Sequence, residues 1–288
     1  FGLHASMSWD VLTKVKNEWN SLIKIQLVAL VPLDYWNTAE GEDFAVRVVR
    51  DRGLLGGVLV PPFDSENTYN LICKMLDLAN RLGCEVDIHI DESASHPAEG
   101  LKLLINALDN TSIQVKVTCS HLSSMGLLPP DQIICLAERL ATHNVNVIAL
   151  PLTNAWLLGR QDQQTPVLRP IAPIKQLQKS GVNVAIGSDN LQDPWFPLGD
   201  LDPISLMSSS LPLLQLEPWN YLGLSPFTIA GAKLMKLEWD GLLKIGCPAD
   251  FVLLKATNWV EALTGNISSR KIMIRGRWLE KDNCKEIN

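Results

Sequence analysis

The segment Val86-Asp87-Ile88-His89-Ile90-Asp91-Glu92 passes from apolar, β-branched residues into a polar end. Strand side chains alternate between two faces, so the pattern predicts a strand in which His89 and Asp91 share one face and Glu92 begins the next loop. A histidine and two carboxylates at the end of a strand suggest chemistry, because such groups bind metals or carry protons. This segment is the starting point for both the fold and the site.

Two further predicted strands end in polar residues, Thr118-Cys119-Ser120-His121 and Gly187-Ser188-Asp189-Asn190. In a barrel of parallel strands the carboxyl ends meet at one face, where the following loops build the active site. Two histidines and an aspartate from three such ends predict a divalent-metal site, because imidazole and carboxylate suit zinc or iron.

Apolar runs alternate with amphipathic stretches along the first two thirds of the chain, as expected for repeated βα units. The predicted strands are Gly2 to Ser6, Ile23 to Leu30, Gly57 to Val60, Val86 to Asp91, Ile113 to Ser120, Val145 to Leu150 and Val182 to Gly187. The predicted helices between them are Trp9 to Trp19, Glu42 to Arg52, Thr68 to Leu82, Ala98 to Leu108, Asp131 to His143 and Pro170 to Lys179.

Seven βα units fit either an eight-stranded barrel without its first strand or a complete doubly wound sheet. A doubly wound nucleotide-binding domain is set aside, because no glycine-rich loop follows a strand. After a proline-rich stretch, the pattern predicts a helix over Ser225 to Leu237 and strands over Ile245 to Leu254 and Lys271 to Leu279. These last residues predict a small β unit.

Composition narrows the class of protein. The chain has 288 residues, 47% of them hydrophobic, and a formal net charge of −6. These values exclude intrinsic disorder, and the absence of a Lys/Arg cluster argues against nucleic acid or an anionic membrane as a partner. No apolar run approaches the roughly 18 residues of a membrane-spanning helix. The six cysteines show no CxxC spacing, which favours reduced thiols and a cytoplasmic location.

The sequence resembles the metal-dependent amidohydrolase superfamily, within it the cytosine deaminase group, which also includes N-isopropylammelide amidohydrolase. The resemblance rests on five segments in order: 86–92, Ser120-His121-Leu122-Ser123-Ser124-Met125, Pro151-Leu152-Thr153-Asn154-Ala155-Trp156-Leu157-Leu158-Gly159-Arg160, 187–199 and Gly246-Cys247-Pro248-Ala249-Asp250. It implies a (βα)8 TIM barrel that lacks its first strand in this chain, over residues 1–238, and a small β-sandwich portion over residues 239–288.

The resemblance also implies one divalent metal ion, zinc or iron. His89 and Asp189 would be metal ligands, Glu92 a proton carrier, and His121 a residue that orients the attacking water. Asp189 would also accept a proton from that water, which makes Glu92, His121 and Asp189 the catalytic residues.

The chain departs from the family pattern at several positions. The His-x-His pair of the family's first strand is absent, and His4, in a segment that resembles the second strand, is not assigned its role. Because the chain begins with Phe1, we expect the pair upstream, and we expect weak metal binding and inactivity without it.

The predicted substrate-binding positions differ as well. Leu33 stands in place of a pyrimidine-binding glutamine, Trp156 in place of a histidine and Asn190 in place of a second aspartate, whereas Trp195 is retained. The pocket is therefore predicted to be less polar than that of a cytosine deaminase.

Two functions follow from these observations. The first is a metal-dependent hydrolase acting on a C–N bond of a small cyclic amidine or amide, a nitrogen heterocycle other than cytosine, and the predicted assembly is a homo-oligomer. The alternative is a catalytically inactive relative kept as a binding or assembly module, suggested by the missing histidine pair. The polar groups at the strand ends favour the enzyme, because a scaffold has no need to bury them.

Overall fold

The computed structural model describes residues 3–265 and 270–279. The chain divides into two compact units, Phe1–Gly199 and Asp200–Asn288. None of the described helices is long and apolar enough to cross a bilayer.

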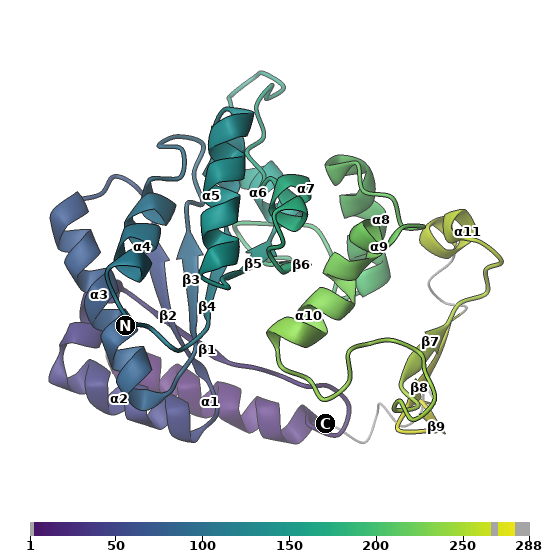
Figure 1. Ribbon diagram of the computed structural model, residues 1–288. Helices are drawn as coiled ribbons and strands as arrows, with labels where there is room; N and C mark the ends of the chain where they lie inside the picture. The colour runs from purple at the N-terminus through teal and green to yellow at the C-terminus, as the bar shows by residue number, and fades with distance from the viewer. Residues whose placement is uncertain (1–2, 266–269, 280–288) are drawn as a thin grey trace. The chain divides into compact units, whose positions relative to one another are not determined.

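The first unit is built on a parallel sheet of six strands in sequential order, β1-β2-β3-β4-β5-β6 (Figure 1). The strands are β1 Val28–Val31, β2 Leu54–Leu59, β3 Val86–Ile90, β4 Val117–His121, β5 Asn146–Ala149 and β6 Val184–Ile186. A doubly wound sheet reverses its strand order at a switch point, whereas a barrel keeps it sequential. The order of these strands is therefore that of the barrel class.

Helices connect the strands and cover the sheet. In the first unit they are α1 Leu3–Trp19, η1 Leu33–Asn37, α2 Ala39–Arg50, α3 Ser65–Leu82, α4 Glu99–Asp109, η2 Ser123–Leu127, α5 Pro130–Thr142, α6 Pro151–Leu157 and α7 Ile174–Lys179. Local capping sets several of these ends. The Asp64 side chain accepts a hydrogen bond from Asn67 N at the start of α3, and Gly83 ends that helix in the left-handed conformation.

The core lies between the outer face of the sheet and the helices. Ile88 and Ile90 of β3 are fully buried, as are Met75 of α3 and Leu104 of α4. Burying one such side chain stabilises the fold by roughly 1.5–3 kcal/mol. The other face of the strands is less covered, since Val58 is 41% exposed. His89, which pairs with Val58 on that face, is half-buried.

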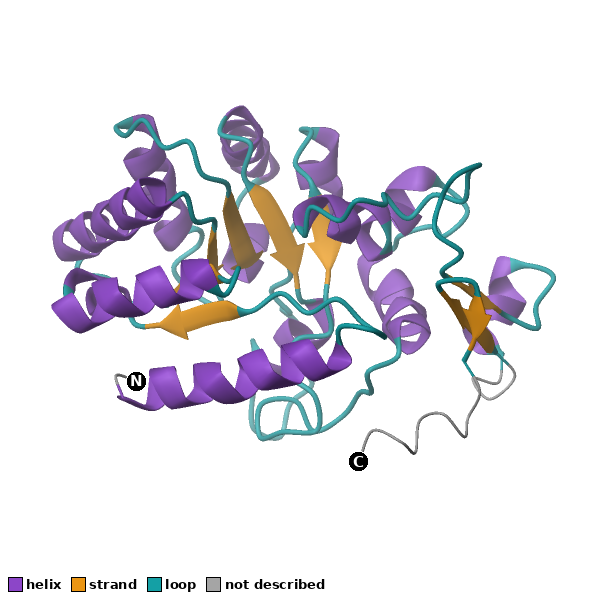
Figure 2. Ribbon diagram, turned by 90° about the horizontal axis from the view of Figure 1, so that it is seen from below, coloured by secondary structure: helices purple, strands orange, loops and turns teal. Residues whose placement is uncertain are grey.

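The predicted strand over Gly2 to Ser6 is wrong, because α1 begins at Leu3 and continues to Trp19. No glycine or proline interrupts residues 3–19, and the segment starts with good helix formers rather than β-branched residues. Figure 2 shows this N-terminal helix beside the sheet. His4 therefore lies on an exposed part of a helix and not on a strand.

Trp9 fixes α1 to the rest of the unit. Its ring is 2% exposed, packs edge-on against Phe44 at a centroid distance of 5.8 Å, and donates from Nε1 to Asp51 Oδ2 at 2.9 Å. A Cβ at Gly53 would lie 2.4 Å from the Trp9 ring, so only glycine fits under the tryptophan.

The second unit contains helices and a small antiparallel sheet. Its helices are α8 Pro203–Leu214, α9 Tyr221–Leu224, η3 Ser225–Phe227, α10 Ile229–Leu234 and α11 Trp259–Thr264, and its strands are β7 Phe251–Leu253, β8 Lys271–Ile274 and β9 Arg277–Trp278. Arg270 donates to both carboxylate oxygens of Asp202, at 2.7 and 2.5 Å, and Asp202 caps the start of α8.

Two predictions for this unit need correction. The single helix over Ser225 to Leu237 is replaced by η3 and the short α10, because Thr228 leaves the helical region at φ −135° and ψ −93°. The single strand over Lys271 to Leu279 is a hairpin of β8 and β9. Arg275 and Gly276 both have positive φ, as a two-residue hairpin turn requires.

Candidate active site

Two histidines meet at the carboxyl ends of β3 and β4. The Nε2 atom of His121 lies 3.4 Å from Nδ1 of His89, and the two rings are 4.9 Å apart. The parallel pairing of β3 with β4 places His89 opposite Ser120 and so brings the next residue, His121, into contact. This contact was expected from the strand-end pattern.

Glu92 and Asp189 complete the group. One ligand atom from each of Glu92, His121 and Asp189 lies within 4.8 Å of the others. His121 Nδ1 lies 3.5 Å from Glu92 Oε1. The chain thus gathers four side chains from the ends of β3, β4 and β6 and the loop after β3, and all four were predicted site residues.

Burial changes the protonation behaviour of this group. Desolvation raises the pKa of Glu92 to about 7, with a further contribution from the nearby charge of Asp189. Desolvation also raises the pKa of Asp189, opposed by a hydrogen bond from Thr153. The pKa of His121 falls to about 3, because of burial first and the neighbouring His89 second. The site therefore holds neutral imidazoles and a glutamate that can gain or lose a proton near pH 7.

Asn154 is a functional residue that the sequence reasoning missed. Its Nδ2 donates to His121 Nδ1 at 3.1 Å and approaches Glu92 Oε1 at 3.3 Å, while its buried Oδ1 has no hydrogen-bond partner among the described residues. Asn154 lies in α6, directly after the predicted strand Val145 to Leu150. That position after a strand end was the same signal that identified the other site residues.

Asp91 does not share a face with His89, which corrects the prediction from alternation. Its backbone has φ +57°, so the strand geometry ends before it and its side chain turns away. The carboxylate accepts hydrogen bonds from Gly100 N and Leu101 N, both at 2.9 Å, at the start of α4. Burial raises the pKa of Asp91 to about 6, although these two hydrogen bonds lower it. Asp91 therefore orients the loop after β3 and lies outside the candidate metal group.

The backbone is strained where the site residues sit. His121 has φ +76° and Asp189 has φ +61°, the left-handed region that side chains other than glycine rarely adopt. Such residues cost on the order of 1–3 kcal/mol each and persist only where surrounding structure holds them, often at functional sites. The left-handed backbone at His121 and Asp189 places both of their side chains beyond the ends of their strands.

The loop after β6 is organised by Asp193. Its Oδ1 accepts from the amides of Trp195 and Phe196, both at 2.9 Å, and its Oδ2 accepts from Asn190 Nδ2 at 2.6 Å. These hydrogen bonds lower the pKa of Asp193. The predicted substrate residues Asn190 and Trp195 are thereby held in one loop, in which Trp195 is 59% exposed.

Trp156 lies next to that loop. Its ring contacts Phe196 edge-on at a centroid distance of 6.3 Å, and the guanidinium of Arg160 lies 5.1 Å from the ring centre. The same helix, α6, also contacts the loop after β6, since Thr153 Oγ1 donates to Ser188 O at 3.3 Å. Through Phe196, Trp156 therefore contacts the loop that carries Asn190 and Trp195.

Leu33 is placed elsewhere. It is 7% exposed, and its Cδ2 atom fills the space next to Gly57, where a Cβ would lie 2.4 Å from it and 3.5 Å from Met75 Sδ. This is the packing of a core residue between β2 and α3. Its role in substrate binding stays a prediction.

The residues present fit a divalent metal ion. Asp189 Oδ2 is buried and has no hydrogen-bond partner in the described part of the chain, an unfavourable state that a cation would relieve. Neutral imidazole and carboxylate are the donors that zinc and iron accept. His89, Asp189, His121 and Glu92 are the residues that could hold the ion.

Comparison with known proteins agrees with this geometry. A sequence model described as "Amidohydrolase family" matches residues 51–271. The chain is 29% identical over 278 residues to a pterin deaminase of Rhizobium rhizogenes, covering 96% of the chain and 62% of the relative. It is 24% identical over 277 residues to an N-isopropylammelide isopropyl amidohydrolase of a Pseudomonas strain, covering 95% of the chain and 65% of the relative.

A solved structure is similar over nearly the whole chain. The crystal structure of 5-methylcytosine deaminase from Klebsiella pneumoniae, liganded with phosphonocytosine, superimposes with a TM-score of 0.78 at 26% identity, covering 94% of this chain and 67% of that one. The chain thus spans between 62% and 67% of the length of these three proteins.

Proposed function

The chain belongs to the amidohydrolase family, and we propose that it forms the catalytic part of a metal-dependent hydrolase that cleaves an exocyclic C–N bond of a small nitrogen heterocycle. The observation that carries this proposal is the convergence of His89, His121, Glu92 and Asp189 beyond three strand ends, with one carboxylate oxygen of Asp189 lacking a hydrogen-bond partner among the described residues.

The metal would be held by His89 and Asp189 and would lower the pKa of a bound water toward about 7. Asp189, whose pKa is raised by burial, is suited to accept a proton. Glu92, with a pKa of about 7, is suited to carry a proton to a ring nitrogen at neutral pH. His121 accepts from Asn154 at Nδ1, so Nε2, which lies 3.4 Å from His89 Nδ1, carries the proton and is proposed to orient a water or substrate oxygen beside His89.

The substrate is proposed to be a flat heterocycle bearing an amino or substituted amino group. Relatives of this chain are named for pterin and N-isopropylammelide, and a similar structure is that of a 5-methylcytosine deaminase. Trp156, Asn190 and Trp195 are the residues proposed to contact it, and Leu33 remains a predicted specificity position. Aromatic side chains beside the site favour stacking on a planar ring.

The sequential order of the six strands supports a (βα)8 barrel over residues 1–238, and the described residues supply six of its eight strands. The antiparallel strands β7–β9 support a β-sandwich portion within residues 239–288. A cytoplasmic location and a homo-oligomeric state remain part of the proposal. An inactive binding module finds no support in relatives that are named for deaminase and amidohydrolase activity.

The test is release of ammonia or amine by the purified full-length protein from pterin, 5-methylcytosine and N-isopropylammelide, with zinc or iron supplied in turn. Turnover of one of these compounds is expected, with loss of activity in Asp189→Asn. The same assay on Asp162→Asn, an exposed aspartate in the loop after α6, is the control for a surface charge change. Absence of turnover with every compound and metal would favour the binding module.

A further inference from the structure

A pocket of about 350 Å³ lies between the C-terminal half of α1 and the C-terminal end of α2. Because α2 ends where β2 begins, this pocket is at the opposite edge of the sheet from the strand ends of the candidate active site. Its lining is polar and rich in cations, namely Thr13, Lys16, Asn17, Asn20, Arg50, Asp51 and Arg52.

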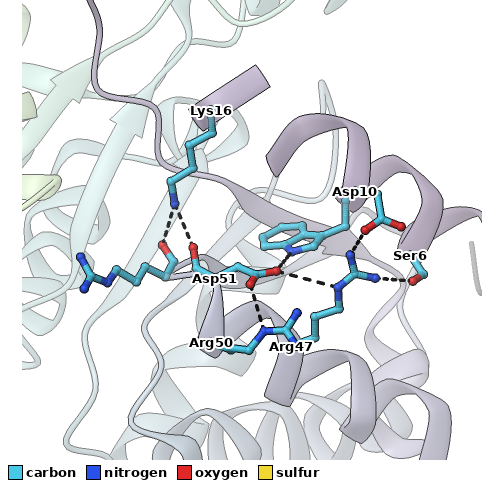
Figure 3. A network of polar contacts seen from close by, with 8 residues as sticks. Ser6, Asp10, Lys16, Arg47, Arg50 and Asp51 are labelled. Carbon is cyan, nitrogen blue, oxygen red and sulfur yellow. Dashed lines mark hydrogen bonds and ion pairs between the residues drawn. The ribbon is translucent and has the colours of Figure 1, made fainter. Parts of the chain in front are cut away.

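Lys16 enters this pocket with its charge incompletely neutralised. Its Nζ donates to the backbone carbonyls of Asp51 at 2.9 Å and Arg52 at 3.5 Å, as Figure 3 shows. Carbonyls accept hydrogen bonds but carry no full negative charge. Burial lowers the pKa of Lys16, the Asp51 charge opposes this, and the Arg52 guanidinium lowers it further. Lys16 and Arg52 are thus two cations close enough to repel.

The one carboxylate of the pocket is already shared. Asp51 accepts from Trp9 Nε1 at 2.9 Å and from Arg50 Nε at 3.1 Å, and Arg47 Nε lies 3.8 Å away (Figure 3). Arg47 also pairs with Asp10. Three cations (Lys16, Arg50 and Arg52) therefore line the pocket with one carboxylate (Asp51), which leaves a surplus of positive charge in a chain whose net charge is −6.

Arg52 is the least explained of these cations. Its backbone has φ +57°, where asparagine or glycine would be less strained. Its side chain makes no hydrogen bond or ion pair with any described residue, so neither the fold nor a salt bridge accounts for an arginine here. Thr13 Oγ1, on the pocket wall, is likewise buried without a partner among the residues described.

The helix ends reduce the positive surplus without removing it. The C-termini of α1 and α2 each contribute about half a negative elementary charge. Lys24, whose Nζ donates to Asn20 Oδ1 at 3.0 Å on the pocket rim, adds another positive charge. Unused donors on Lys16, Arg50, Arg52 and Thr13 therefore surround a cavity that carries net positive charge.

We propose that this pocket binds a phosphate group, as inorganic phosphate or as the monoester of a small molecule. A phosphate carries about −1.5 to −2 charge at pH 7 and several strong acceptor oxygens, which match the surplus charge and the unused donors. Arginine suits this ligand particularly well, because its planar guanidinium binds two phosphate oxygens at once.

Calorimetry on the full-length protein tests the proposal, with inorganic phosphate or glycerol 3-phosphate titrated at constant ionic strength against a chloride reference. Saturable binding of one phosphate group per chain is expected. Tighter binding of glycerol 3-phosphate indicates a monoester as the natural ligand, and equal or tighter binding of inorganic phosphate indicates the free anion. No saturable binding of either compound above the chloride reference overturns the proposal.

Two variants locate the site. Arg52→Asn introduces a residue that tolerates the left-handed backbone. It should weaken phosphate binding at least about tenfold, as loss of a charged hydrogen-bonding partner typically does. Arg81→Asn is the matched control, because Arg81 is an exposed arginine paired with Glu42 and Asp77 outside the pocket. Equal weakening in both variants, or unchanged binding in Arg52→Asn, would assign the phosphate to another surface and refute this pocket.

Discussion

The Nδ2 atom of Asn154 donates a hydrogen bond to Nδ1 of His121 across 3.1 Å, in a position where both residues are at most 1% exposed. An amide nitrogen only donates, so His121 Nδ1 must accept and the proton of the neutral ring is on Nε2. The protonation geometry of the candidate catalytic histidine is thus set by a residue on the neighbouring helix.

The first prediction concerns this contact. Asn154→Leu keeps the volume of the side chain but removes the donor to His121 and Glu92, so we expect kcat to fall roughly 10–100-fold with little change in KM. The control is Asn146→Leu, which removes a buried amide on β5 that accepts from Asn183. This control should lower the stability of the protein without altering the dependence of kcat on pH. An equal loss of kcat in both variants would contradict a positioning role for Asn154.

The second prediction concerns Glu92. Glu92→Gln removes a proton carrier whose pKa is about 7 while keeping a similar shape. Turnover should fall about 10²- to 10⁴-fold, with the fold and the metal content retained. Circular dichroism and elemental analysis check the two retained properties. Loss of metal together with activity would make Glu92 a ligand, and near wild-type turnover would remove it from the mechanism.

Much of this site could be predicted from the sequence because strand ends in a parallel sheet converge. His89, His121 and Asp189 were found from the polar residues that close three apolar runs, and the register of β3 with β4 brings the histidines together. The prediction from strand alternation was wrong one residue beyond the strand, at Asp91, because a left-handed backbone turns the side chain of Asp91 toward α4. Such a turn depends on the donors of α4, which are nine and ten residues away.

Contacts distant in sequence explain the other errors. A short segment such as Leu3 to Ser8 fits a strand or a helix by composition, and its helical state depends on packing of Trp9 over Gly53, 44 residues later. Leu33 was predicted to bind substrate because of its position in the family pattern. The orientation of its side chain depends instead on Gly57 and Met75, which leave space for it in the core. Neither relationship is visible in the local pattern.

The third prediction is that cytosine is a poor substrate. Leu33 packs in the core and offers no polar atom to a substrate, and Trp156 presents an aromatic ring at the loop after β6. A buried amide edge without a partner costs about 1–3 kcal/mol, roughly one to two decades in kcat/KM. Comparison of kcat/KM for cytosine and pterin measures the difference. Cytosine deamination as fast as that of the best substrate would contradict it.

The fourth prediction concerns the metal. Adding zinc to the chelator-treated full-length protein should raise its melting temperature, because at 100 times Kd a ligand stabilises by about 2.7 kcal/mol. Asp189→Asn should lose most of this shift, since it replaces the carboxylate whose Oδ2 has no hydrogen-bond partner in the described part of the chain. Asp193→Asn, in the same loop but bonded to amides, should keep it. Equal shifts in all three proteins would show that zinc binds elsewhere.

The last prediction uses the buried carboxyl of Asp87. This residue on β3 is 7% exposed, accepts a hydrogen bond from Ser120 Oγ at 2.7 Å, and has its pKa raised by burial to about 6 from an ordinary 3.8. A raised folded-state pKa stabilises the protein below the unfolded pKa, and this contribution is lost as pH rises toward the folded value.

The metal-free wild-type protein should therefore lose stability relative to Asp87→Asn between about pH 4 and pH 6, and the difference should be constant above that range. The expected change is about 3 kcal/mol, from roughly 1.4 kcal/mol for each pKa unit. Asparagine keeps an oxygen that can accept from Ser120, so the comparison isolates the charge. Urea unfolding across this pH range measures it, with Asp77→Asn on the exposed face of α3 as the control. A difference between wild type and Asp87→Asn that does not vary with pH would show that the Asp87 carboxyl titrates normally in the folded protein.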